Sequence, residues 1–235
     1  MLKKNISLAV VAARKGSKGI KNKNLTRINN EPITKIATRI ALSCKKIQKV
    51  VFTSDSDKIL NTVKNDKNLT KLKRKASLSK STTPMLPVLK DAVNFFEKTN
   101  PIKFKVSNVV IVDPTAPLRK ISDLNKSINI FNRKKPDLLI SVHEAQHNPY
   151  FSMLEKKGKF YKLSKTYNKN PGSRQEVPKV YEVNTIVWIY SRNAIFKEKK
   201  RIPKKTLIIK TPLNRSVDID TKEDIKKIKY YLSKK

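Results

Sequence analysis

The sequence is poor in the residues that build cross-links, metal clusters and membrane spans. Cys44 is the single cysteine among 235 residues, so no disulfide can form within the chain, and we expect a reducing cytoplasm as its compartment. No apolar run approaches the roughly 18 residues of a membrane-spanning helix, and we expect no membrane partner. His143 and His147 are four residues apart, but no third ligand is spaced to complete a metal site with them.

Acidic residues are also scarce. The chain has 18 of them against 54 lysines and arginines, which gives a net charge of +36. Such a charge is typical of proteins that bind nucleic acids. However, only ten of the cations are arginine and the lysines are spread along the whole chain. We therefore expect no specific nucleic-acid partner, and a field that attracts small anionic substrates.

Short apolar runs alternate with segments of helical spacing, which predicts an α/β fold. The runs 8–13, 50–53, 109–112, 138–142, 184–190 and 206–209 are expected to be strands, and 32–44, 59–63, a segment from 86, 122–131 and a segment from about 222 to be helices. We expect one domain over 1–235 with an insertion at about 143–182, where the alternation breaks and residues 151–163 resemble a β-hairpin. Asp55 is expected to cap the helix that follows it, and a position facing the ligand is the alternative.

A cationic glycine loop follows the first apolar run, Leu8 to Ala13, which we interpret as a strand rather than a signal peptide. The loop reads Arg14-Lys-Gly-Ser-Lys-Gly19 and is followed by Lys21 and Lys23. Glycines let a backbone approach a ligand closely, and the cations favour a phosphate. Two known phosphate-binding motifs do not fit. The two glycines are only three residues apart, which is too close for a P-loop, and the third glycine that the dinucleotide fingerprint needs is absent.

Several motifs in this order resemble the acylneuraminate cytidylyltransferases, which make CMP-sialic acid and related CMP-nonulosonates. Residues 13–24 are similar to the family signature Ala-Arg-x-x-Ser-Lys-Gly-x-x-x-Lys-Asn. Pro114-Thr-Ala-Pro-Leu-Arg119, Asn148-Pro-Tyr150, Arg174-Gln175, Asn184 and Ser216-Val-Asp-Ile-Asp-Thr221 extend the likeness along nearly the whole chain. The resemblance implies a Rossmann-like nucleotidyltransferase fold, with a mostly parallel sheet, helices on both faces and a β-hairpin insertion that forms a homodimer.

The resemblance also implies a reaction and a nucleotide site. CTP and an acidic nine-carbon sugar would give a CMP-sugar and pyrophosphate. Arg14 and Lys23 would act with Asp218 and Asp220 in catalysis, and Arg119 would tie its loop to the fold. The nucleotide would be held by Ala13, Arg14, Gly16, Ser17, Gly19, Lys23, Asn24 and Arg74. The family's acidic residue beyond Arg74 is absent here, where Ser81-Thr-Thr83 stands.

Asp218 and Asp220 are two residues apart, which puts both carboxylates on one side of an extended segment. Carboxylates so placed suit Mg²⁺, or Mn²⁺, together with phosphate oxygens and water. Capping of the last helix by Asp220 and Thr221 is the competing interpretation. Asp113 is a third candidate ligand and stands where many family members have glutamine.

For the sugar, the resemblance implies contacts from Asp113, Thr115, Arg174, Gln175, Glu182 and Asn184. Glu182 stands where sialic-acid enzymes usually have arginine, which resembles the branch that activates legionaminic acid. A carboxylate can accept a hydrogen bond from the additional acetamido group of that sugar; pairing with a surface lysine is the alternative. Two further alternatives to the reaction itself are a 3-deoxy-manno-octulosonate cytidylyltransferase and a family member that has lost activity.

Overall fold

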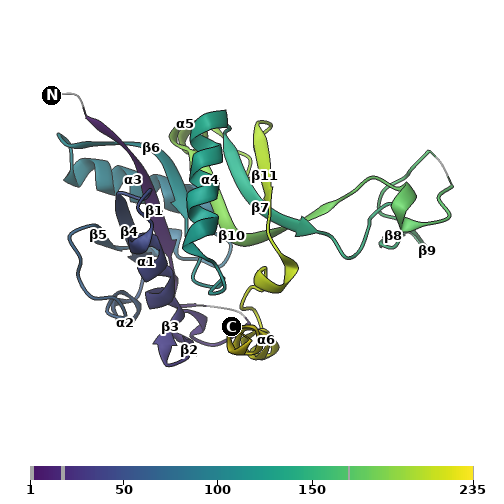
Figure 1. Cartoon of the computed structure of the whole chain (residues 1–235), viewed down its shortest axis with the longest axis horizontal. Helices are drawn as coiled ribbons and strands as arrows, with labels where there is room; N and C mark the ends of the chain where they lie inside the picture. Colours follow the sequence, from purple (N-terminus) through teal and green to yellow (C-terminus); the bar gives the residue numbers. More distant parts are fainter. Residues whose placement is uncertain (1–2, 17–18, 169, 235) are drawn as a thin grey trace.

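The computed structural model describes residues 3–16, 19–168 and 170–234. Its centre is a seven-stranded sheet in the order β11-β7-β10-β6-β1-β4-β5 (Figure 1). The strands are β1 (Lys4–Ala12), β4 (Lys49–Ser54), β5 (Leu69–Lys73), β6 (Phe104–Ile111), β7 (Leu138–Glu144), β10 (Tyr181–Ser191) and β11 (Thr206–Lys210). β10 runs antiparallel to both of its neighbours, and the other pairings are parallel. The mostly parallel sheet expected from the sequence is confirmed.

Helices cover both faces of this sheet, as expected. They are α1 (Ile33–Ser43), α2 (Asp57–Leu60), α3 (Met85–Thr99), α4 (Ile121–Lys134), α5 (Arg192–Lys197) and α6 (Lys222–Ser233). One buried cluster joins α1, α2, α4 and α6 to strand residues such as Val11 and Phe52. A second cluster joins α3 and α5 to the opposite face through Leu8 and Val10. Successive β1 side chains therefore enter the two cores alternately.

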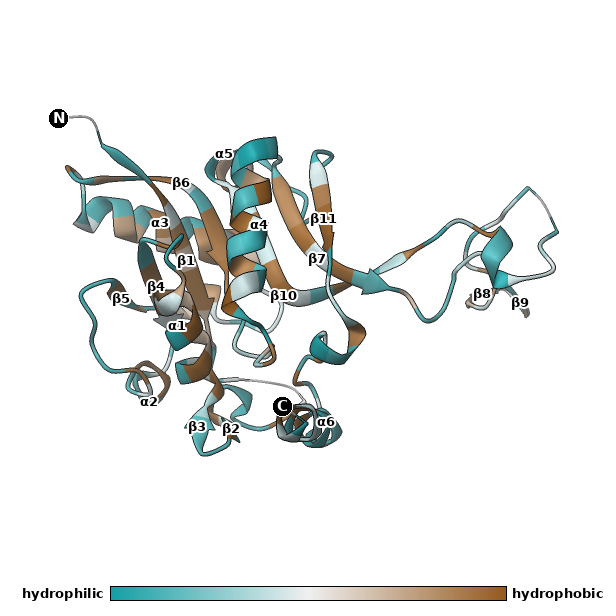
Figure 2. Ribbon diagram, viewed as in Figure 1, coloured by the Kyte–Doolittle hydropathy of each residue, from teal (hydrophilic) through white to brown (hydrophobic). Residues whose placement is uncertain are grey.

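The apolar runs that predicted strands are the brown centre of Figure 2, whereas the outer faces of the helices are teal. β1 is buried on both faces from Ile6 to Val11, which is why its sequence is continuously apolar from Leu8 onwards rather than alternating. In the described part of the chain, no helix combines the length and the apolar character needed to cross a membrane.

Residues between β7 and β10 form an arm that leaves the body of the molecule (Figure 1). Its hairpin pairs β8 (Leu154–Lys157) with β9 (Phe160–Leu163) in antiparallel register, as residues 151–163 predicted. Gly158 forms the turn with a φ of 65°, which glycine adopts without steric cost. The interruption expected at 143–182 is thus a projecting arm.

Three small elements differ from the prediction. β2 (Arg27–Ile28) and β3 (Glu31–Pro32) form a two-stranded ribbon beside the glycine loop. β5 is an edge strand within a segment that is too polar to identify from the sequence. α5 follows β10 directly, with the Ser191 hydroxyl accepting the N–H of Ala194.

Candidate active site

The predicted nucleotide residues meet at the carboxyl ends of the parallel strands, where open α/β sheets bind ligands. A cavity of about 390 Å³ opens there. Eight residues named from the sequence line it: Arg14, Gly19, Lys23, Asn24, Arg74, Asp113, Thr115 and Asp220. They come from the ends of β1, β5 and β6 and from the segment before α6.

The glycine loop is fixed from both sides. The Asn24 amide donates to the Arg14 carbonyl at 2.9 Å, and Asp55 Oδ1 accepts the N–H of Lys15 at 2.8 Å. Asp55 therefore holds the loop instead of capping α2, whose N-cap is Ser56, and the capping prediction is wrong. Ala13 continues the sheet by donating its N–H to the Thr53 carbonyl. Ser17 lies outside the described residues.

Gly19 is the point where the loop meets the aspartate segment. A Cβ placed on Gly19 would lie 2.5 Å from the Asp220 carbonyl oxygen, so a larger residue cannot keep this contact. Gly16 is less constrained, because its Cβ would meet the Arg14 side chain at an ordinary 3.5 Å. The same two segments are joined by Lys23 Nζ, which lies 2.8 Å from Asp220 Oδ1.

Arg74 is the buried cation of the cavity. Its guanidinium donates to the Thr53 carbonyl at 2.8 Å, and the residue is only 6% exposed. Burial lowers the pKa of Arg74, and the negative charges of Asp55 and Asp91 partly oppose that effect. A buried cation held by the sheet is preorganised for an anion, because its position need not be established when the ligand binds.

Asp218 is an acidic group in an unfavourable electrostatic environment. Burial raises the pKa of its carboxyl, and the nearby charge of Asp113 raises it further. Its Oδ1 is buried and has no hydrogen-bond partner among the described residues. Asp113 Oδ1, in contrast, accepts from the N–H and the hydroxyl of Thr115 at 3.0 and 2.8 Å.

This arrangement fits a divalent cation, because a cation would neutralise Asp218 and coordinate its unpartnered oxygen. Among the described residues, no group of three acidic, histidine or cysteine side chains could hold an ion alone. Asp218 and Asp220 would supply two ligands and the substrate phosphates and water the rest, which is how Mg²⁺ is commonly bound. Asp220 also lies next to the N-cap Thr221, whose hydroxyl and N–H donate to Asp224. Of the two residues in the competing capping interpretation, Thr221 is therefore the one that caps α6.

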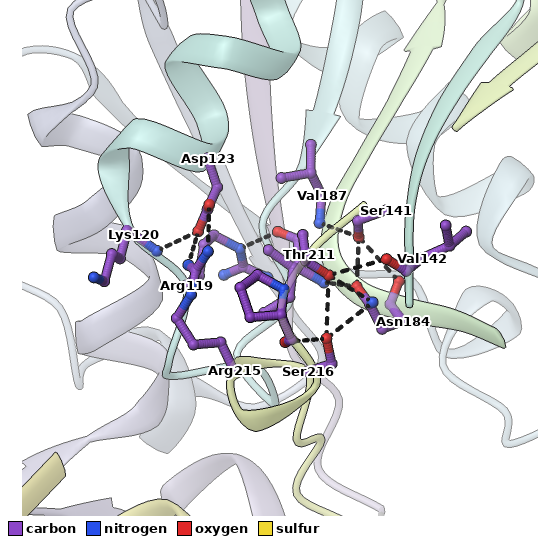
Figure 3. Close-up of polar contacts among 12 residues, drawn as sticks. Arg119, Lys120, Asp123, Ser141, Val142, Asn184, Val187, Thr211, Arg215 and Ser216 are labelled. Atoms are coloured by element: carbon purple, nitrogen blue, oxygen red, sulfur yellow. Dashed lines mark hydrogen bonds and ion pairs between the residues drawn. The ribbon is translucent and has the colours of Figure 1, made fainter. Parts of the chain in front are cut away.

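Arg119 anchors the loop that carries Asp113. It donates to the Asp113 carbonyl and, across the sheet, to the carbonyls of Thr185 and Ile186, which confirms its predicted structural role. Burial lowers the pKa of Arg119 to about 10. Arg215, in the segment between β11 and α6, pairs with Asp123 in the first turn of α4 (Figure 3).

Asn184 lies in a separate polar network on β10. Its Oδ1 accepts from the Ser141 hydroxyl at 2.6 Å, and its Nδ2 donates to Thr211 and Ser216 at 2.9 and 3.2 Å (Figure 3). These bonds connect β7, β10 and the segment after β11. Asn184 is 6% exposed, and it positions the chain that leads to Asp218 rather than lining the cavity.

The other predicted sugar residues lie further out. Arg174 and Gln175 line a second cavity of about 580 Å³ at the base of the arm, where Arg174 donates to the Ala145 carbonyl. Glu182 Oε2 is 3.3 Å from His143 Nε2, with its side chain 63% exposed. Its partner is therefore a histidine instead of the lysine considered as an alternative. Within one chain, these three residues do not line the nucleotide cavity.

Sequence reasoning missed part of the cavity wall. Lys80, Ser81 and Thr83, in the segment that precedes α3, and Met85, the first residue of α3, also line it. Lys80 adds a fourth cation to Arg14, Lys23 and Arg74. The only available signal was the position of this segment shortly after Arg74, because its polar composition gives no periodicity.

An α/β sheet with a cationic glycine loop facing an aspartate pair at its carboxyl edge defines an enzyme of the nucleotidyltransferase class. The chain belongs to the family described as Cytidylyltransferase, whose model matches residues 8–234.

Relatives of known name agree with this assignment. The chain is 29% identical to CMP-N,N'-diacetyllegionaminic acid synthase of Campylobacter jejuni, over 97% of this chain and 95% of that protein. Post-translational flagellin modification protein B of Campylobacter coli is similar to the same degree and over the same shares. N-acylneuraminate cytidylyltransferase of Streptococcus agalactiae is 22% identical over 92% of this chain and 51% of that protein.

Solved structures share the fold. CMP:2-keto-3-deoxy-manno-octonic acid synthetase in complex with CTP superposes with a TM-score of 0.67 at 11% identity, covering 97% of this chain and 99% of that one. The 4-diphosphocytidyl-2C-methyl-D-erythritol synthase of Anaerococcus prevotii gives a TM-score of 0.61 at 15% identity, with the same coverage.

Proposed function

We propose that this enzyme transfers CMP from CTP to a nonulosonic acid and releases pyrophosphate. The observation that carries the proposal is the single cavity in which Arg14, Lys23 and Arg74 face Asp220, in a chain of the cytidylyltransferase family. The sugar's anomeric hydroxyl would attack the α-phosphorus and form the new P–O bond. The bond to the β-phosphate oxygen would break, and the hydroxyl proton would pass to solvent.

The protein's contribution is to position the two substrates and to neutralise charge, which is what phosphoryl-type transfers require. Arg74 would fix the nucleotide from within the sheet. Lys23 would exchange its contact with Asp220 for the departing pyrophosphate, where it stabilises the charge that develops. Arg14, whose carbonyl is held by Asn24, would add a second cation.

Mg²⁺ or Mn²⁺ is proposed as the cofactor, held by Asp218 and Asp220 and, as a further candidate, Asp113. It would supply Lewis-acid stabilisation of the phosphate oxygens. The support is the buried, unpartnered oxygen of Asp218 within the described residues. Lys23 already partners Asp220, so that carboxylate is placed to exchange one cation for another.

Among nonulosonic acids, we propose N,N'-diacetyllegionaminic acid as the preferred substrate. The support is the near-full-length similarity to a synthase named for that product, together with the carboxylate of Glu182. The decisive assay measures pyrophosphate release from CTP with N,N'-diacetyllegionaminic acid, N-acetylneuraminic acid and 3-deoxy-manno-octulosonate. We expect the first to give the highest kcat/KM and excess EDTA to abolish turnover. Turnover with none of them would refute the reaction, and full activity in EDTA would remove the metal.

The role of Glu182 is tested by the variant Glu182→Arg. An arginine can donate but cannot accept a hydrogen bond, so the preference for the diacetylated sugar should narrow by about tenfold. The KM for CTP should not change, because Glu182 lies outside the nucleotide cavity. Glu223→Arg, an exposed glutamate on α6 whose side chain pairs only with Lys226, is the matched control and should leave the preference intact. An unchanged preference in Glu182→Arg would show that this carboxylate serves only His143.

A homodimer is the third part of the proposal. Arg174 and Gln175 lie on the arm, outside the nucleotide cavity of their own chain. They could bind the sugar's carboxylate only if the arm of a second copy approaches the site, and the exposed apolar side chains of the hairpin would favour such an association.

A further inference from the structure

A second deep cavity lies at the other end of the sheet, at the amino ends of the parallel strands. It measures about 820 Å³, within the range of pockets that bind small molecules. Its walls come from the start of β1, the turn after α1, the segment before β7 and the beginning of α5. Ile128 and Phe131 of α4 form its apolar side. The nucleotide cavity, at the carboxyl ends, shares none of these residues.

A β-bulge shapes the wall of this cavity. Ile6 pairs with Val106, but Ser7 pairs with Asn108, so Ser107 is the additional residue in β6. The Ser107 hydroxyl donates to the Ile6 carbonyl at 2.9 Å, which fixes the bulge. Bulges commonly occur next to binding sites, where they redirect a side chain. Here, the bulge places both Ser107 and Asn108 in the cavity wall.

Asn108 is an unusual residue for the centre of this sheet. It is 2% exposed, and its Oδ1 has no hydrogen-bond partner in the part of the chain that the structure describes. Its Nδ2 makes only long contacts, 3.2 Å to Ser107 Oγ and 3.5 Å to Asn132 Oδ1. An unsatisfied buried amide destabilises a fold, so its presence in a cavity wall indicates a role in binding.

The charges of the wall favour an anion. Lys4, Lys45, Lys46 and Lys135 contribute to the lining, against one carboxylate, that of Asp137. The turn that carries Lys45 and Lys46 is fixed by Gln48, which accepts the Ser7 N–H of β1 at 2.9 Å and donates to the Lys46 carbonyl at 3.0 Å. These two cations are therefore presented by a turn that is tied to the sheet.

The polar groups of the wall favour hydroxyl groups over a nucleobase. Asn5, Gln48, Asn108, Asn132 and Asn193 give it five carboxamides, each of which can both donate and accept, as a sugar hydroxyl can. The one aromatic side chain of the described lining, Phe131, is 5% exposed and offers little surface for stacking. We propose that this cavity is a second binding site, specific for a small sugar that carries an acidic group, either a phosphate or a carboxylate.

Calorimetric titration of the full-length chain tests the proposal, with glucose 6-phosphate and glucuronate as the two acidic probes. Glucose is the control for the sugar hydroxyl groups, and inorganic phosphate is the control for the anionic group. We expect at least one acidic sugar to bind about tenfold more tightly than either control, because both the anion and the hydroxyls contribute. Changes in backbone amide NMR shifts should concentrate at residues 45–48 and 107–108 and at Lys135 and Asp137. Failure of both acidic sugars to bind, or equal binding of inorganic phosphate, would overturn the site.

Variants separate this cavity from general charge effects. Lys45→Glu with Lys46→Glu should weaken binding about tenfold or more. Lys58→Glu with Lys229→Glu changes the net charge equally, on exposed residues outside the cavity, and should have no effect. Asn108→Leu should abolish binding while the melting temperature stays equal or rises. Arg74→Ala, in the nucleotide cavity, should retain binding. Equal loss in the two charge-reversed variants, or loss only in Arg74→Ala, would refute the second site.

Discussion

At the scale of the residue, the site is built from charges that the fold holds close together at a cost to its own stability. Asp218 is half-buried, its pKa is raised by burial and by the charge of Asp113, and its buried Oδ1 lacks a partner among the described side chains. Asp220, by contrast, is 69% exposed and already paired with Lys23. The two aspartates of one short motif therefore have different environments, and Asp218 depends more on a bound cation.

The variant Asp218→Asn tests this dependence. The folded-state pKa of Asp218 is raised above its ordinary value of 3.8, so its ionisation destabilises the fold as pH rises through that interval and remains unfavourable at neutral pH. We expect Asp218→Asn to raise the melting temperature at pH 7 in EDTA, with the gain vanishing near pH 3. Turnover should fall on the order of 10²-fold.

Calorimetry with and without Mg²⁺ provides the comparison. The unmodified chain should gain stability from the metal and CTP together, and Asp218→Asn should gain much less. A lower melting temperature of the variant in EDTA at neutral pH would contradict the electrostatic explanation.

At the scale of the element, the site depends on loops that touch one another at the carboxyl edge of the sheet. Ile219 donates its N–H to the Thr115 carbonyl at 2.9 Å, which joins the aspartate segment to the loop after β6. Gly19 joins the same segment to the loop after β1. A shift of one loop is therefore transmitted to the others.

Gly19→Ala should separate these loops. The added Cβ would lie 2.5 Å from a backbone atom, the Asp220 carbonyl oxygen, so no side-chain rotation can relieve the clash. We expect kcat/KM to fall by about 10²-fold, because displacements of about an ångström are enough for such losses. The melting temperature should change little, since the contact joins two loops outside the hydrophobic core. Gly16→Ala is the matched control and should keep most activity; equal effects of both variants would exclude the contact as the cause.

The sequence predicted those elements whose structure depends on the pattern of neighbouring residues in the chain. Continuous apolar runs identified β1, β4, β6 and β7, and the motif residues around them converged on one cavity. β5 was missed because a polar edge strand lacks the run of apolar residues that marks a buried strand. Lys80 was missed because its loop has no hydrophobic periodicity. The placement of Asp55 against Lys15 could not be read either, since it depends on how β4 and the glycine loop lie in space.

At the scale of the whole molecule, the arm carries apolar side chains that remain exposed to solvent. Phe160 is 74% exposed, Tyr161 64% and Leu154 62%, all on the hairpin β8–β9 (Figure 1). A two-stranded hairpin alone is marginally stable in water, and exposed apolar patches usually mark an interface. Association of two copies through their arms would cover these residues and bring Arg174 of one copy towards the site of the other.

Mixing two inactive variants tests both parts of this proposal. Arg174→Ala would disable the sugar contact, and Asp220→Ala the metal and Lys23 contact. If Arg174 acts on the partner's site, a mixed dimer has one site with neither defect and one with both. After exchange of subunits at equal amounts, half of the dimers are mixed, so activity should recover to about a quarter of the unmodified level. If Arg174 acts within its own chain, every site in the mixture carries one defect and no activity returns. Phe160→Asp, which places a charge in the apolar hairpin, should abolish the recovery and give a monomer by light scattering. Tyr230→Asp, an exposed aromatic on α6, is the control and should leave both the dimer and the recovery intact.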